Sequence, residues 1–219
     1  MIISWRLARF KAIKDQMEQL TFGDLTLFTG VNSSGKSTVI QSMLMMMQTI
    51  SNRENTSLHI NGELVRLGQV DDIWYGGELP DGDPEKRLKI EVLVKGDGEN
   101  ALYMLMEFEP LRETEVRLVF AEYARGNEEI GYDERLVIEW QDNAYRITEM
   151  SLPLQQAVKR QLQDNGLSQI KPFEGAQVEM YDYYPQRMLV QALTESDELN
   201  WSIAISNPLS DILTDDQLT

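Results

Sequence analysis

The feature that most constrains this 219-residue chain is a short glycine-containing loop between an apolar run and a helix-like stretch. Residues 30–37, GVNSSGKS, fit the pattern G-x-x-x-x-G-K-[ST] at every fixed position. The run Leu25–Phe28 before the loop has the length and composition of a buried β-strand. From Ser37 onward, apolar residues recur at helical spacing, and no Gly or Pro interrupts them for fifteen residues. The sequence therefore predicts a strand, a tight loop and a helix in succession.

The loop suits the binding of a chain of phosphates. Gly30 and Gly35 carry no Cβ, so the backbone can turn tightly there and approach phosphate oxygens closely. Successive backbone N–H groups would form an anion-binding nest, and a helix that begins near Lys36 would add the partial positive charge of its N-terminus. The residues expected to take part are Gly30, Asn32, Ser33, Ser34, Gly35, Lys36, Ser37 and Thr38.

Three residues at the end of the loop have separate expected roles. Lys36 would reach the β- and γ-phosphates, the Ser37 hydroxyl would fill one coordination position on Mg²⁺, and Thr38 would donate a hydrogen bond to the α-phosphate. The alternative is a Gly-Ser loop that only connects a strand to a helix. Because both flanks have the character that a phosphate-binding loop requires, we expect ATP and Mg²⁺ as ligands.

Composition argues against several other classes of function. The formal net charge of −16 would repel a nucleic-acid backbone, so no direct binding of nucleic acid is expected. The absence of cysteine and the single histidine exclude a disulfide framework and a thiolate or histidine-rich metal site. The sequence shows no apolar run of eighteen residues and no signal-peptide layout. We therefore expect a cytoplasmic protein without a membrane partner.

Five segments from residue 87 onward alternate apolar and polar residues as strands do, namely 87–95, 101–109, 115–123, 134–140 and 144–150. Turn-forming residues separate them, among them Pro110, Gly126-Asn127 and Asp142-Asn143. This pattern predicts an antiparallel meander with one wet face, on which the charged side chains are solvated. A helix is expected over Leu152–Asn165, with Pro153 in its first turn and Gly166 beyond its end.

The N-terminal segment RLARFKAIKD…LTFGDLTLFTGVNSSGKSTVIQSM carries a family resemblance. Its expected order is a strand over 2–9, a corner at Phe10-Lys11, an antiparallel strand over about 16–22, and then the strand and loop. This order resembles the N-terminus of ABC-type head ATPases of the RecF, SMC and OLD class. Their corner reads N-F-(R/K), so Arg9 replaces the usual Asn here. The resemblance implies that Lys11 contacts a phosphate or the ribose, whereas the alternative is a solvated lysine on a turn.

Within that class, roughly the first 75 residues most resemble stand-alone AAA family ATPases of anti-phage defence operons, Septu-like systems among them. In those proteins the loop helix is followed by glutamines and long apolar residues, as in Gln41–Gln48. A segment G-x-x-V-x-L-G-x-(F/V)-x-D-(L/I) comes next, and residues 62–73 resemble it.

Three features in this region have plain structural interpretations. The methionines Met43, Met45, Met46 and Met47 are expected to fill gaps in the core. The dipeptide Asn61-Gly62 is typical of a hairpin turn. Asp71 or Asp72 is expected to cap a short helical turn that ends near Gly76-Gly77. A metal pair at Asp71-Asp72 is the alternative, but no third ligand has suitable spacing.

Motifs that complete such an ATPase are missing from the sequence. No run of four apolar residues ends in Asp-Glu, as a Walker B strand does, and no serine-glycine signature follows residue 100. The runs Leu118–Glu122 and Arg135–Glu139 end in a single acid and fall within the meander. In the class these motifs lie in the C-terminal half of the protein. The chain therefore resembles the N-terminal half of a head ATPase.

We accordingly expect an α/β fold, the N-lobe of a P-loop NTPase of the ABC-type head class with an antiparallel β-rich subdomain. The whole chain would form one incomplete ATPase head domain. Residues 1–80 would form the core with the phosphate loop, 81–151 the meander, and 152–219 a helix and a return segment towards a missing C-terminal half.

The resemblance implies an ATP·Mg²⁺-binding portion of an ATPase that acts as a sensor or regulator in anti-phage defence or another DNA transaction. The implied partners are a second copy in an ATP-dependent head dimer, or the missing C-terminal half, and a nuclease effector. One alternative is a nucleotide-binding interaction module that never hydrolyses ATP, and another is one half of a split ATPase. A GTPase would need a guanine-reading N-K-x-D motif, which the sequence lacks.

Overall fold

The computed structural model describes residues 1–15, 18–32, 34–51, 57–95, 100–127, 131–164, 175–181, 184–192 and 201–206. The chain has an α/β fold with a large antiparallel sheet. It divides into two compact units, one formed by residues 1–94 and 104–120 and the other by residues 95–103 and 121–219. The long strands β4 (Asn100–Arg112) and β5 (Glu115–Asn127) contribute residues to both units.

In the first unit, β1 (Ile2–Ala8) lies between β2 (Leu20–Thr21) and β3 (Leu88–Lys95) and runs antiparallel to both. Strands β4 and β5 follow β3 in the strand order. Leu88, Ile90 and Val92 are buried at alternate positions of β3, which gives this strand one core-facing side. The strands expected over residues 2–9 and 87–95 are confirmed, whereas the strand expected over 16–22 has only two residues in the described part of the chain.

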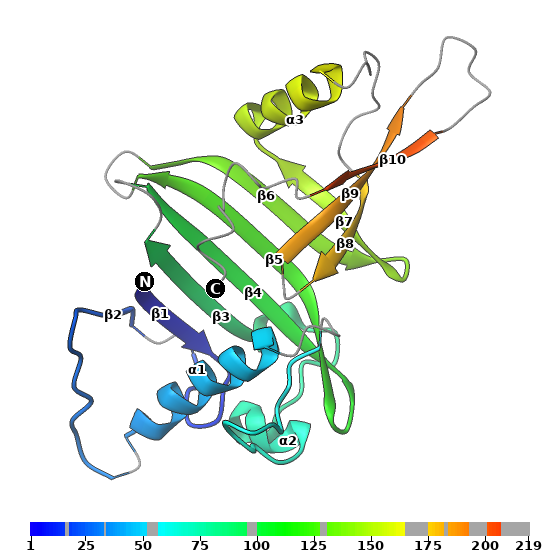
Figure 1. The fold of residues 1–219 in the computed structure, drawn as a ribbon. Coiled ribbons are helices and arrows are strands. Elements are labelled where there is room, and N and C mark those ends of the chain that lie inside the picture. The colour runs from blue at the N-terminus through cyan, green and yellow to red at the C-terminus, as the bar shows by residue number, and fades with distance from the viewer. Residues whose placement is uncertain are drawn as a thin grey trace. The chain divides into compact units, whose positions relative to one another are not determined.

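Helix α1 (Lys36–Ser51) confirms the helix expected after the loop, and it lies alongside β1 (Figure 1). One face of α1 is buried against the sheet, with Met45 fully buried and Met46 nearly so. These two methionines lie in the core as expected. Met47 is 57% exposed, because it lies on the opposite face of the same helix. The methionine run therefore belongs to the core only in part.

The prediction of a buried strand over Leu25–Phe28 is wrong. These residues have no regular secondary structure, and the Leu25 and Leu27 side chains are 80% and 76% exposed. An apolar strand is stable only when neighbouring strands accept its hydrogen bonds and cover its side chains. In the described part of the first unit, β1 already pairs on both sides, with β2 and β3, so it offers no edge to residues 25–28.

Short helical turns connect α1 to β3. They are α2 (Val70–Ile73), η1 (Tyr75–Gly77) and η2 (Pro84–Lys86). The turn expected at Asn61-Gly62 is present, since Asn61 bridges to Arg66 and the Gly62 N–H donates to the Val65 carbonyl at 2.9 Å. The cap expected from Asp71 or Asp72 is also confirmed. The Asp72 carboxylate accepts a 2.8 Å hydrogen bond from the Gln69 N–H at the start of α2.

The second unit continues from β5 through β6 (Gly131–Gln141), β7 (Ala144–Met150), β8 (Gln177–Tyr181), β9 (Tyr184–Ala192) and β10 (Trp201–Ser206), in that order. Neighbouring strands from β6 to β10 all pair antiparallel. Asp142 and Asn143 have φ of 50° and 62°, the conformation that a two-residue hairpin turn requires. Helix α3 (Leu152–Asp164) packs against β6 and buries Leu154 and Val158. The expected helix is confirmed, although Asn165 and Gly166 lie outside the described residues.

All five expected meander strands are present as β3 to β7, but two of the expected separators lie inside strands. Pro110 lies within β4, near the C-terminal end of the strand. Proline has no backbone N–H to donate to a neighbouring strand, so it fits in a sheet only where that donor is not needed. Gly126 lies within β5, and a Cβ added there would lie 2.2 Å from the Gly131 carbonyl oxygen. Glycine at this position permits a close approach of two strands, rather than a turn.

Candidate functional site

The glycines of the loop have the backbone conformation that the motif predicts. Gly30 has φ of 143° and Gly35 has φ of 86°, a region that residues with a Cβ rarely adopt. A Cβ at Gly30 would lie 3.1 Å from the Ser34 hydroxyl. The chain then enters α1 at Lys36. Sequence and structure therefore agree on a tight glycine turn that leads into a sixteen-residue helix.

The Lys36 side chain folds back over this loop. Its ammonium donates hydrogen bonds to the carbonyls of Gly30 at 2.8 Å and Val31 at 2.6 Å, and it lies 3.3 Å from the Ser34 hydroxyl. An ammonium has three donors, so loop oxygens occupy all of them here. The arrangement places a positive charge above the loop, and phosphate oxygens could replace these acceptors as charge-assisted partners.

The remaining expected contacts lie close by in the chain but differ in exposure. Asn32, Ser34 and Ser37 are exposed, so their polar groups are accessible at the loop and on the first turn of α1. Thr38 is 7% exposed and belongs to the buried face of α1. Ser33 lies outside the described residues. An exposed Ser37 hydroxyl is compatible with a place in the coordination shell of a divalent cation.

The corner that carries Lys11 has an unusual backbone. Arg9 and Lys11 have φ of 60° and 50°, although neither is glycine. Phe10 between them is completely buried. The Lys11 side chain is half-buried. Two backbone hydrogen bonds join the corner to residues 73 and 75, from the Lys11 N–H to the Ile73 carbonyl at 2.8 Å and from the Tyr75 N–H to the Arg9 carbonyl at 3.1 Å, and a bond from the Arg9 N–H to the Lys14 carbonyl at 3.2 Å closes it internally.

The residues that bond to this corner belong to the segment 57–77. A glutamine of α1 that the sequence analysis did not single out contacts the same segment. Gln48 in α1 is 6% exposed and uses its amide on the segment's backbone. The signal was visible, because Gln48 is a polar residue on the apolar face of a helix pattern. Such a residue is buried only when its hydrogen bonds are satisfied.

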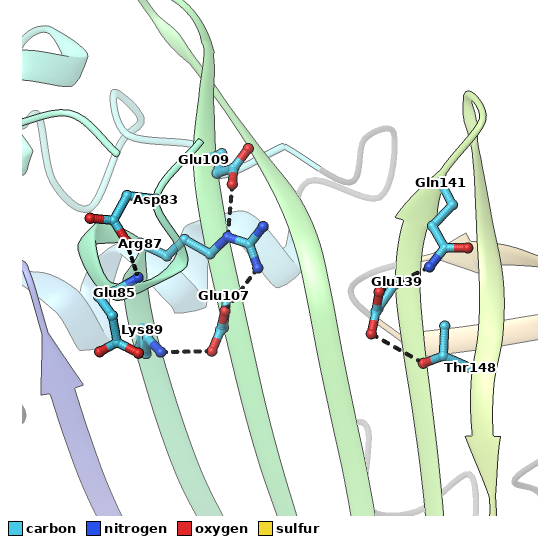
Figure 2. Close-up of polar contacts among 9 residues, drawn as sticks. All are labelled: Asp83, Glu85, Arg87, Lys89, Glu107, Glu109, Glu139, Gln141 and Thr148. Carbon is cyan, nitrogen blue, oxygen red and sulfur yellow. Dashed lines mark hydrogen bonds and ion pairs between the residues drawn. The ribbon is translucent and has the colours of Figure 1, made fainter. Parts of the chain in front are cut away.

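The charged side chains on the meander strands of the first unit are less solvated than expected. Figure 2 shows Arg87 reaching Glu109 and Glu107 on β4, with Nε–Oε1 and Nη1–Oε2 distances of 2.7 Å and 3.2 Å, and Lys89 reaching Glu107 at 2.9 Å. Glu107 is 8% exposed. Partial burial works against the charge on Arg87, but the hydrogen bonds that the guanidinium donates to both glutamates outweigh it and raise the pKa of the guanidinium. These carboxylates therefore form a structural ion-pair ladder.

No family model matches the sequence, and no curated protein matches it significantly. Within the described ranges, no three His, Cys, Asp or Glu side chains are grouped to hold a metal ion. None of the helices in that part of the chain combines the length and apolar content needed to cross a membrane.

Proposed function

We propose that this chain binds ATP with Mg²⁺ through the 30–37 loop and is the N-terminal portion of an ABC-type ATPase of the RecF, SMC and OLD class. One observation carries the proposal. Gly30 and Gly35 both adopt positive φ in a turn that opens α1, and the Lys36 ammonium lies over that turn. A loop that merely joined two elements would need neither the paired glycines nor a lysine directed at its carbonyls.

Different residues of the chain would bind the phosphates, neutralise their charge and hold the metal ion at this site. Loop N–H groups and the start of α1 would bind phosphate oxygens, and Lys36 would neutralise the β- and γ-phosphates. Ser37 would provide one oxygen ligand to Mg²⁺, which shields phosphate charge when bound. Lys11 would contact a phosphate or the ribose, as the family resemblance implies.

Exposed apolar residues support a partner at this site. Besides Leu25 and Leu27, the Val31 side chain is 77% exposed, and the outer face of α1 exposes three further apolar side chains, Ile40, Met47 and Ile50. Exposed apolar surface of this kind favours association. The partner in this proposal is a second copy in an ATP-dependent dimer or the C-terminal half of such an ATPase. A nuclease effector and a sensor role in anti-phage defence rest on the family resemblance alone.

A second candidate function is nucleotide binding without hydrolysis by this chain. The two apolar runs that end in an acid lie in β5 and β6, which belong to the meander. The Glu122 carboxylate is held by Arg135, with an Oε1–Nε distance of 2.6 Å. The Glu139 carboxylate accepts hydrogen bonds from Gln141 and Thr148 (Figure 2). Both acids therefore have structural partners, which favours a binding module whose catalytic acid comes from elsewhere.

Isothermal titration calorimetry with ATP and Mg²⁺ tests the proposal. The wild-type chain is expected to bind, and Lys36→Ala is expected to weaken binding about 10- to 150-fold, the loss of a hydrogen bond to a charged group. Lys14→Ala is the matched control, because Lys14 is exposed and outside the loop. Circular dichroism should show both variants folded. Equal affinity of Lys36→Ala and the wild type would overturn the site.

A further inference from the structure

The corner at Arg9 and Lys11 needs outside support to keep its backbone conformation. A residue with a Cβ is disfavoured at the positive φ that both residues adopt. Two such residues within three positions persist only where the surrounding structure holds them. The position of the Lys11 side chain therefore depends on whatever fixes its backbone.

The 57–77 segment supplies part of that support, beside the hydrogen bond from the Arg9 N–H to the Lys14 carbonyl within the corner and the one from the Arg9 Nε to the Glu85 carbonyl. Its Ile73 carbonyl accepts from the Lys11 N–H, its Tyr75 N–H donates to the Arg9 carbonyl, and Trp74 forms a backbone bridge with Phe10. Ile73 is completely buried and Trp74 is 2% exposed, so these contacts lie in a packed region. Movement of the segment would displace the corner with it.

Gln48 in turn helps to hold the segment, beside backbone hydrogen bonds from the Leu58 N–H to the Val116 carbonyl at 2.8 Å and from the Val70 N–H to the Glu113 carbonyl at 3.0 Å. Its Oε1 accepts from the Val65 N–H at 2.9 Å, and its Nε2 donates to the Val65 carbonyl at 3.1 Å and to the His59 carbonyl. The amide thus pairs with Val65 as one peptide group pairs with another in a sheet. The neighbouring Thr49 hydroxyl accepts from the His59 N–H at 2.9 Å.

The segment passes close over the Gln48 amide. A Cβ at Gly62 would lie 2.7 Å from the Gln48 Oε1, so a larger residue there would displace the amide from its present position. Lys36 opens α1, and Gln48 lies twelve residues further along it, which is about 18 Å at the helical rise of 1.5 Å per residue. Helix α1 therefore carries the phosphate loop at one end and the anchor of the segment near the other.

We infer that Gln48 is a positioning residue for the nucleotide site: through the 57–77 segment it holds Lys11 in the place from which Lys11 contacts the nucleotide. The inference rests on the proposed function, because Lys11 needs a nucleotide to contact. A purely structural role for Gln48 predicts a different result, since its loss would then loosen the whole unit and would not act through Lys11.

Hydrogen exchange measured by NMR without nucleotide tests the structural link. Gln48→Ala is expected to speed exchange of the Lys11 amide about tenfold or more, while the Leu7 amide in β1 serves as an internal reference. Gln41→Ala, a change of the same type at a half-buried position of α1, should leave the Lys11 amide unchanged. Equal acceleration at Lys11 and Leu7, or none at Lys11, would overturn the inference.

A double-mutant cycle of ATP affinity tests the functional link. Gln48→Ala is expected to weaken binding about tenfold in the wild-type background and less than about twofold in Lys11→Ala, since both changes then remove the same contact. Equal losses in the two backgrounds would overturn the inference. Gln48→Met keeps most of the side-chain volume without the amide, and it serves if the alanine variant does not fold. If the wild type does not bind ATP, the proposed function is contradicted. The exchange experiment uses no nucleotide, so it still tests the structural link between Gln48 and Lys11.

Discussion

The indole Nε1 of Trp5 donates a 3.1 Å hydrogen bond to the hydroxyl of Ser42, and both side chains are buried. Trp5 belongs to β1 and Ser42 to α1, so the bond joins the strand that leads to the Lys11 corner to the helix that follows the 30–37 loop. Ser42 donates its own proton to the Val39 carbonyl at 2.7 Å, which orients the hydroxyl to accept from the indole.

Removal of this hydroxyl should destabilise the fold. Ser42→Ala leaves the indole N–H buried without its acceptor, which costs about 1–3 kcal/mol of unfolding free energy. Urea denaturation measures the change. The control is Ser51→Ala, whose exposed hydroxyl donates only to the Met47 carbonyl of the same helix, and its effect should stay within about 0.5 kcal/mol. Similar losses in the two variants would show that the Trp5 contact does not contribute.

Replacement of Lys11 should change stability and affinity in opposite directions. Asparagine tolerates the positive φ of this position better than lysine, so Lys11→Asn should raise the unfolding free energy by up to about 1 kcal/mol. The same change removes the proposed nucleotide contact and should weaken ATP binding. Thermal melting and calorimetry measure the two effects. Lys14→Asn, at an exposed position of the same corner, should alter neither, and a Lys11→Asn variant that binds ATP as well as wild type would remove Lys11 from the site.

Steady ATP turnover by this chain alone should be negligible. Phosphoryl transfer to water needs a group that orients the attacking water and a second carboxylate near the metal, and the sequence has no Asp-Glu pair at the end of an apolar strand. A phosphate-release assay with saturating ATP and Mg²⁺ measures the rate. Turnover that disappears in Lys36→Ala would show that this chain contains an acid with the Walker B role.

The exposed apolar residues beside the loop should make the chain associate. We expect it to pair with itself or with a co-expressed C-terminal fragment of the same kind of ATPase, and pairing with that fragment should raise the melting temperature. The charge of −16 opposes self-association, so added salt should strengthen it. Light scattering measures the association with and without the fragment and at each salt concentration, and thermal melting measures the change in melting temperature.

Substitution of an exposed leucine beside the loop, compared with an exposed leucine elsewhere, gives the control for association. Leu27→Ser should reduce pairing, whereas Leu64→Ser, at a 48% exposed leucine in the turn of the 57–77 segment, should not. A monodisperse monomer that melts cooperatively, and gains nothing from the fragment, would count against the half-ATPase proposal.

Much of the candidate site could be predicted because its determinants are local. The glycines at 30 and 35 are placed by the motif, and the helix after them follows from apolar spacing without Gly or Pro. The Asp72 cap likewise depends on a backbone N–H three residues away. Gln48 escaped prediction because its partners are eleven and seventeen residues distant and become neighbours only when the segment folds back onto α1.

The sequence alone determined the strands from residue 87 to 150, the two-residue turn at Asp142-Asn143 and the helices α1 and α3, because periodicity and turn chemistry act between residues close in the chain. Only the tertiary structure decided that Leu25 and Leu27 are exposed and that Arg6 pairs with Glu91 at 2.8 Å. A strand exists only where another strand accepts its hydrogen bonds, and that neighbour is set by the fold as a whole. An apolar run can therefore have every local feature of a strand and still remain unpaired.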